Sequence, residues 1–373
     1  MLASEFLRLT GATFFTGVPD SQLKPLCDEI YLRYQQQPEH HIIAANEGNA
    51  CGIAAGHYLG TGDVPLVYLQ NSGLGHIINP AASLLHPLVY GIPVLFVIGW
   101  RGQPGVHDEP QHLFQGQVTL RLLEDMDIAN FVLTKQTTSD TVSQVMDDFR
   151  ERFRRGLSCA FVVSKGALES SGKPDYTHPG SMTREEALEI ITSYTGNAPI
   201  VSTTGKASRE LFEIRERRHE THAHDFLTVG SMGHASSIAL GLALTHPEKR
   251  VFCIDGDGAL LMHMGAMVTL AHVHPDRFVL VLINNGSHDT VGGMPTAIES
   301  VQVPQLARNL KFDHVLSCSD PQSLHQAMQE LCAAEGLCLL EIHCAGGARS
   351  DLGRPTVSPQ ENMHAFMAAL ETP

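Results

Sequence analysis

The stretch Arg250–Gly293 constrains the fold of this chain more than any other. It predicts a strand at Val251–Ile254, a tight turn at Gly256-Asp257-Gly258 and an apolar helix from Ala259 to about Ala271. A second buried strand is expected at Phe278–Ile283, where another apolar run follows. Two strands joined by a helix predict a right-handed β-α-β unit, and such units build parallel sheets.

The two polar turns of this unit carry its chemistry. One contains Asp257, and the other, Asn284-Asn285-Gly286, contains Asn285. Both turns lie at the carboxyl edge of a parallel sheet, so we expect the two side chains to be neighbours. Carboxylate, amide and carbonyl oxygens suit Mg²⁺, and the start of a helix favours an anion such as diphosphate. An ordinary turn with an incidental aspartate explains Gly-Asp-Gly alone equally well, but the asparagine pair favours a Mg²⁺-diphosphate site.

Gly-Asp-Gly followed by Asn-Asn at this spacing resembles the diphosphate motif of thiamine diphosphate (ThDP) enzymes. The resemblance implies that Asp257, Asn285 and the carbonyl of Ser287 bind Mg²⁺, with Asn284 the less favoured amide. Three further residues of the first turn would contact the cofactor: Gly256, Gly258 and Ala259.

A second informative stretch, Ala45–Leu59, predicts a helix with small residues along one face. Glu47 lies at its start, where it would be poorly solvated; stabilisation by the helix dipole is the simpler explanation. The pattern Asn-Glu-x-x-Ala-x-x-x-Ala-x-Gly resembles the activating-glutamate helix of ThDP enzymes. By that resemblance Glu47 is catalytic and hydrogen-bonds the aminopyrimidine ring of the cofactor. The family builds its active site from two subunits, which implies a homodimer or larger assembly with the glycine face as candidate interface.

Two further turns are candidate cofactor contacts. Gly230 and Met232 occupy a turn that resembles the one holding the pyrimidine and supporting the bent cofactor, although core packing also explains a methionine. Thr203 and Thr204 follow a strand and precede a helix, where they would contact diphosphate or simply cap the helix.

The order of predicted elements defines the fold class. The chain has 373 residues, enough for two ordinary domains, and both halves alternate strands with helices. We expect an α/β protein with two tandem doubly wound parallel-sheet domains of the ThDP-binding fold and no middle domain. Residues 1–165 would bind the pyrimidine, 166–182 form a Gly/Ser/Pro-rich linker and 183–373 bind the diphosphate. Thr183 and Glu186 predict a capping box at the start of the second domain.

Composition excludes several classes of protein. The formal net charge of −15 argues against general nucleic-acid binding. The longest apolar run, near Pro87–Trp100, is too short to cross a membrane, and no signal peptide is evident. The eight cysteines are scattered singly, which favours reduced thiols and a cytoplasmic location.

Six stretches that follow or precede predicted elements carry a narrower resemblance: Thr16–Ser21, Asn71–Gly75, Gly99–Gly102, Asp108–His112, Asn285–His288 and Val291–Gly293. They resemble loops of phosphonopyruvate decarboxylases, whose nearest relatives are sulfopyruvate decarboxylases. One departure is His76, where asparagine is more usual. The resemblance implies that ThDP and Mg²⁺ support conversion of the anionic 2-oxo acid 3-phosphonopyruvate to phosphonoacetaldehyde and CO₂, in phosphonate biosynthesis. The alternatives are sulfopyruvate as substrate, or an inactive cofactor-binding regulatory subunit.

Decarboxylation requires groups that move protons and a cation for the substrate's distal anion. The candidate proton relays, all in these loops, are His112, His288, Ser21 and Asp20. Arg101 is the candidate cation because it follows a predicted strand at the same sheet edge, although a solvated surface arginine is an equal alternative. Asn71 and His112 complete the predicted substrate contacts.

Overall fold

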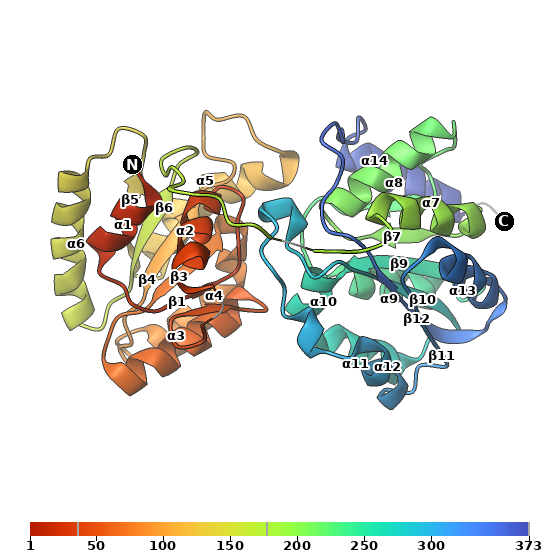
Figure 1. Cartoon of the computed structure of the whole chain (residues 1–373), viewed down its shortest axis with the longest axis horizontal. Coiled ribbons are helices and arrows are strands. Elements are labelled where there is room, and N and C mark those ends of the chain that lie inside the picture. The colour runs from red at the N-terminus through yellow and green to blue at the C-terminus, as the bar shows by residue number, and fades with distance from the viewer. Residues whose placement is uncertain (36, 177, 372–373) are drawn as a thin grey trace. The chain divides into compact units, whose positions relative to one another are not determined.

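The structure is a computed structural model that describes residues 1–35, 37–176 and 178–371. The chain divides into two compact units, Met1–Asp175 and Tyr176–Pro373, and the division falls inside the predicted linker. Each unit contains a six-stranded sheet with parallel pairing throughout (Figure 1). The predicted fold class, two tandem doubly wound α/β domains, is therefore confirmed.

The sheet of unit 1 has the strand order β2-β1-β3-β4-β6-β5. Its strands are β1 (Phe15–Gly17), β2 (His41–Ile43), β3 (Leu66–Gln70), β4 (Leu95–Gly99), β5 (Ala129–Leu133) and β6 (Cys159–Val163). Its α-helices are α1 (Ala3–Thr10), α2 (Lys24–Tyr34), α3 (Glu47–Thr61), α4 (Leu74–Pro80), α5 (Pro110–Asp125) and α6 (Ser139–Arg154).

Alternate residues of the strands enter cores on opposite faces of the unit 1 sheet. Phe161 of β6 contacts Phe6 of α1 and Phe149 of α6, with ring centroids 5.2 Å apart in each pair. Its neighbours Ala160 and Val162 join the core formed with α3 and α4. A sheet covered on both faces explains why its central strands are continuous apolar runs.

The sheet of unit 2 has the order β11-β12-β10-β9-β7-β8. Its strands are β7 (Ile200–Ser202), β8 (Asp225–Leu227), β9 (Val251–Gly256), β10 (Arg277–Asn284), β11 (His314–Cys318) and β12 (Gly336–His343). Its α-helices are α7 (Arg184–Thr195), α8 (Lys206–Arg217), α9 (Ala235–Thr245), α10 (Asp257–Met262), α11 (Gly265–Val273), α12 (Val303–Asn309), α13 (Pro321–Ala333) and α14 (Pro359–Leu370). The helices α7, α8 and α13 pack on one face of this sheet, and α9, α11 and α12 on the other (Figure 1).

The structure corrects the predicted elements in three places. The helix expected from Ala259 to about Ala271 is two helices, because His263 leaves the helical region (φ −134°, ψ 46°) between α10 and α11. The strands β5 and β11 were not predicted. Both are edge strands, and most of their residues are only partly buried, which weakens the apolar signal. The capping box of Thr183 and Glu186 is present.

Of the helices in the described part of the chain, none is long and apolar enough to cross a membrane.

Candidate active site

The carboxyl edge of the unit 2 sheet brings its two predicted turns together. Asp257 is the first residue of α10 and is buried, at 3% exposure. Its Oδ1 accepts a hydrogen bond from the backbone N–H of Gly258 and its Oδ2 accepts one from Gly286, both at 2.6 Å. Burial raises the pKa of Asp257 to about 6. The carboxylate therefore joins the end of β9 to the loop after β10, and a bound cation there would favour its charged form.

The loop after β10 holds the other predicted ligands through one carboxylate, Asp289. The amide nitrogen of Asn285 donates to Asp289 at 2.8 Å, and the hydroxyl of Ser287 donates to it at 3.0 Å. The amide oxygen of Asn285 accepts from the backbone N–H of Ser287 at 3.1 Å. Asn284 instead donates to Glu341 at 2.8 Å, so its amide is engaged with β12.

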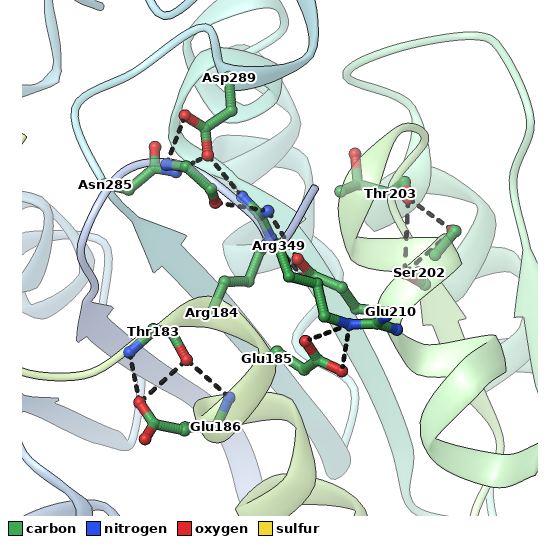
Figure 2. Close-up of polar contacts among 12 residues, drawn as sticks. Thr183, Arg184, Glu185, Glu186, Ser202, Thr203, Glu210, Asn285, Asp289 and Arg349 are labelled. Carbon is green, nitrogen blue, oxygen red and sulfur yellow. Dashed lines mark hydrogen bonds and ion pairs between the residues drawn. The ribbon is translucent and has the colours of Figure 1, made fainter. Parts of the chain in front are cut away.

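Asp289 is itself held by a buried ion-pair network that the sequence did not reveal (Figure 2). Arg184, the first residue of α7, is 6% exposed and lies 2.6 Å from Glu210 and 2.8 Å from Asp289. It also donates to the carbonyl of Gly347 at 3.1 Å, while the N–H of Gly347 donates to Asp289 at 2.9 Å. The only sequence signal was an arginine in the first turn of a helix, where the dipole disfavours a cation.

The remaining predicted contacts of unit 2 lie at the same edge. Thr203 follows β7 and its backbone N–H donates to Ile254 of β9 at 2.8 Å, at the point where the strand order reverses. A Cβ placed on Gly258 would lie 3.2 Å from the ring of His288 and 3.3 Å from the end of Met232, so both side chains lie beside Gly258. Burial lowers the pKa of His288 to about 4, so the ring is neutral near pH 7.

Four other predicted contacts lie in or beside these turns. Thr204 is half-buried before α8, Gly230 lies in the turn after β8, and Ala259 is buried in α10. A Cβ on Gly256 would meet nothing within 4 Å, so the turn is open on that side.

The carboxyl edge of the unit 1 sheet holds Glu47 in a closely packed position. Glu47 is the first residue of α3 and is 4% exposed; the side chain of Asn46 caps the helix by accepting from Asn49 at 2.8 Å. One oxygen, Oε2, lies 2.5 Å from Nδ1 of His76 on α4. A Cβ on Gly73 would lie 2.3 Å from the other oxygen, Oε1, so only glycine fits beside this carboxylate. The sequence showed His76 as a departure but not as the partner of Glu47.

Asp20 and Ser21 follow β1 at the same edge. Asp20 is fully buried, and its Oδ2 accepts from the backbone N–H groups of Gln22 at 2.9 Å and Leu23 at 3.1 Å. Burial raises its pKa, and the hydrogen bond from Gln70 opposes that shift. Ser21 is exposed, and its hydroxyl accepts from Arg101 at 3.2 Å.

Arg101, the predicted substrate cation, is already paired. Its guanidinium forms two hydrogen bonds with Asp108, of 2.8 and 2.5 Å, and this pairing raises the pKa of Arg101. Asn71 is fully buried; its amide nitrogen donates to the carbonyl of Arg101 at 2.8 Å, and its oxygen accepts from the Arg101 N–H at 3.1 Å. Asn71 therefore positions the loop that carries Arg101. His112 lies half-buried in the first turn of α5, with its carbonyl packed against Gly102. Asp108 lies in one of the stretches that carry the resemblance, but its pairing with Arg101 was not predicted.

The structure thus assembles the predicted residues as two groups, one at the carboxyl edge of each sheet. In both units the strand order reverses next to the first strand, which is where parallel α/β sheets bind ligands.

Comparison with known families agrees with this arrangement. Residues 2–123 match the thiamine pyrophosphate enzyme N-terminal TPP binding domain, and residues 203–342 match the thiamine pyrophosphate enzyme C-terminal TPP binding domain. Thiamine pyrophosphate is another name for ThDP. The chain therefore belongs to the thiamine pyrophosphate enzymes, and ThDP is its cofactor.

Full-length relatives narrow the class. The chain is 33% identical to a phosphonopyruvate decarboxylase of Streptomyces viridochromogenes, over 97% of this chain and 92% of that protein. It is 34% identical to one of Streptomyces hygroscopicus, over 95% and 90%. It is 26% identical to a sulfopyruvate decarboxylase of Methanosarcina acetivorans, over 98% and 96%. The chain is a ThDP-dependent decarboxylase related to both kinds of enzyme.

The residues at the two edges fit the cofactor in their donor chemistry. Asp257, Asn285 and Ser287 supply carboxylate, amide and carbonyl oxygens, and hard oxygen donors are what Mg²⁺ prefers. The open side of Gly256 leaves room beside them. The carboxylate of Glu47 is held between His76 and Gly73, in a position suited to one directed hydrogen bond.

Proposed function

We propose that this chain converts 3-phosphonopyruvate to phosphonoacetaldehyde and CO₂, with ThDP and Mg²⁺, as a step of phosphonate biosynthesis. The observation that carries the proposal is the similarity to two phosphonopyruvate decarboxylases over at least 95% of the chain. Sulfopyruvate is the second candidate substrate, because the similarity to a sulfopyruvate decarboxylase also covers the whole fold.

The proposal gives the unit 2 residues the task of holding the cofactor's charged end. Asp257, the amide oxygen of Asn285 and the carbonyl of Ser287 would hold Mg²⁺ against the diphosphate. Asp289 supports these three ligands, because it accepts a hydrogen bond of 2.8 Å from the amide nitrogen of Asn285. The amide oxygen is thereby left as the ligand atom. The backbone turns at Thr203, Thr204 and Gly256–Ala259 would contact the diphosphate, and Gly230 and Met232 the pyrimidine side.

The bound cofactor supplies an electron sink for the charge left when CO₂ departs. Glu47 would hydrogen-bond the aminopyrimidine through one oxygen. Its low exposure strengthens that bond, because little water competes for the carboxylate. His288, which is neutral near pH 7, is a candidate proton relay, and His112 and Ser21 are the others. Asp20 is fully buried and tied to backbone N–H groups, so we assign it to holding the Ser21 turn.

Arg101 would contact the distal anion of the substrate. Its contacts with Asp108 and Ser21 fix the direction of the guanidinium, which suits a planar donor that must meet a tetrahedral anion. We propose further that the working enzyme is a homodimer or larger, with the cofactor held by the first domain of one copy and the second domain of another.

Steady-state assays with 3-phosphonopyruvate and sulfopyruvate test the proposal directly. We expect phosphonopyruvate to have the higher kcat/KM and turnover to require both ThDP and Mg²⁺. Faster turnover of sulfopyruvate would replace the proposed substrate. Glu47→Gln should remove turnover while the protein stays folded; an active variant would overturn the role of Glu47. A folded wild-type protein that binds ThDP but turns over neither acid would favour a regulatory subunit.

A further inference from the structure

The partner of Glu47 is the place where this chain departs from the motifs it otherwise resembles. Nδ1 of His76 lies 2.5 Å from Oε2 of Glu47, so the imidazole occupies one oxygen of the carboxylate. The other oxygen, Oε1, lies against Gly73. The helices α3 and α4 meet closely here, since a Cβ on Gly48 would be 3.2 Å from the carbonyl of His76. The contact is therefore built into the packing of two helices.

We propose that His76 is a positioning residue for Glu47, holding Oε2 so that the carboxylate keeps one direction for its contact with the cofactor, and making this arrangement depend on the protonation of the imidazole. The inference rests on the proposed role of Glu47 toward the aminopyrimidine. It assigns to His76 a function that an asparagine at this position would perform only in part, because an amide can donate a hydrogen bond but carries no charge.

The electrostatics of the pocket agree with this assignment. The hydrogen bond from Glu47 raises the pKa of His76, and partial burial of the ring opposes the shift. The other ionisable group facing the pair from α3 is the Cys51 thiol, whose pKa is raised to about 12, mainly by burial, so it stays neutral. No titratable group belongs to the short helix Asn71–Gly73 that packs against α4. His76 is thus the group beside Glu47 whose charged form the carboxylate favours.

The sign of the effect follows from the charges. Below the pKa of His76 the imidazolium attracts the carboxylate and holds it in place. As the pH rises through that pKa the attraction is lost, and Glu47 is held only by a neutral hydrogen bond. We therefore expect ThDP binding to weaken across this range, by about tenfold for each pKa unit of coupling between ThDP binding and the protonation of His76.

The first measurement uses the cofactor-free protein and needs no turnover. The His76 ring signal is assigned by its absence from the NMR spectrum of H76N, and its titration is followed in wild type and in E47Q. We expect the midpoint to fall in E47Q, because the carboxylate that favours imidazolium is gone. Identical midpoints would overturn the proposed coupling.

The second measurement is the dissociation constant of ThDP, with Mg²⁺ present, from pH 5.5 to 8.5. H76N should bind ThDP with little of the pH dependence seen in wild type, and H76A should bind weakly at every pH. His364→Asn, on the exposed side of α14, is the matched control and should follow the wild-type curve. If wild type binds ThDP and turns over substrate while H76N shows the same pH profile, the inference about His76 fails and the proposed function stands. If wild type does not bind ThDP, the proposed function fails, and the NMR result still decides the His76–Glu47 coupling.

Discussion

Replacing Arg184 with methionine should cost more stability than any surface substitution in unit 2. Arg184 is 6% exposed and lies between the carboxylates of Glu210, at 1% exposure, and Asp289. Methionine has a similar length but leaves both carboxylates without their cation. Removing one partner of a buried ion pair costs about 3–5 kcal/mol, because the remaining charge is uncompensated. At 2–4 °C per kcal/mol for a unit of this size, the melting temperature should fall by roughly 10 °C.

The assay is urea denaturation followed by far-UV circular dichroism, with thermal melts in parallel. Trp100, the single tryptophan of the chain, lies in unit 1, so its fluorescence serves as a reference while unit 2 is destabilised. The matched control is Arg217→Met. That arginine pairs with Glu185 and Glu189 on the surface, where such pairs contribute about 0–1 kcal/mol.

A second variant separates loss of charge compensation from loss of packing. In R184M/E210Q the uncompensated Glu210 carboxylate is removed, so more than half of the lost stability should return. If R184M is no less stable than R217M, or if E210Q restores nothing, the reasoning about the buried network is wrong. R184M should also weaken Mg²⁺-dependent ThDP binding, because Asp289 holds the amide of Asn285.

Three further predictions concern pH, space and metal. Burial lowers the pKa of His41 from 6.5, so as the pH falls through 6.5 the unfolded chain binds a proton that the folded chain refuses. The free energy of unfolding should therefore decrease as the pH is lowered, by up to about 1.4 kcal/mol per pH unit. His41→Gln should flatten that slope in urea midpoints measured from pH 7.5 to 5.5. Gly73→Ala places a Cβ 2.3 Å from Oε1 of Glu47 and should abolish ThDP uptake in calorimetry. Gly265→Ala, whose Cβ meets nothing within 4 Å, should leave uptake unchanged, and normal uptake by G73A would contradict the packing argument. Asp257→Asn should remove Mg²⁺-dependent uptake, because a neutral amide replaces the charged oxygen ligand; retained magnesium dependence would exclude Asp257 as a ligand.

The sequence predicted the parts of this fold that depend on local apolar pattern. The strands β9 and β10 contain the predicted ranges Val251–Ile254 and Phe278–Ile283, because both are buried apolar runs that end in polar turns. The edge strands β5 and β11 escaped prediction because their residues are only partly buried. The break between α10 and α11 also escaped, since His263 lies within an apolar run that continues helical periodicity on both sides.

The candidate site divides in the same way. Glu47, Asp257 and Asn285 were predicted as site residues because each follows a strand, and strand ends define the functional edge of a parallel sheet. The supporting contacts were not predicted, because Arg184 is 105 positions from Asp289 and His76 is 29 positions from Glu47. Pairings of this kind depend on how helices pack, which a single sequence does not specify. Asn71 was predicted to contact the substrate, and in the structure its amide forms hydrogen bonds with the backbone of Arg101.

The pairing of Arg101 bears on how this enzyme would distinguish its two candidate substrates. A phosphonate can carry two negative charges and a sulfonate one, so an uncompensated cation would favour the phosphonate. Arg101 is not such a cation in this structure, because Asp108 takes two of its hydrogen bonds and cancels its charge. The guanidinium offers direction and N–H donors rather than net charge, and both anions accept hydrogen bonds. Discrimination must therefore come from the number and geometry of the hydrogen-bond donors around the phosphonate or sulfonate group. For this reason a comparison of the two 2-oxo acids tests the substrate more sharply than any substitution at Arg101.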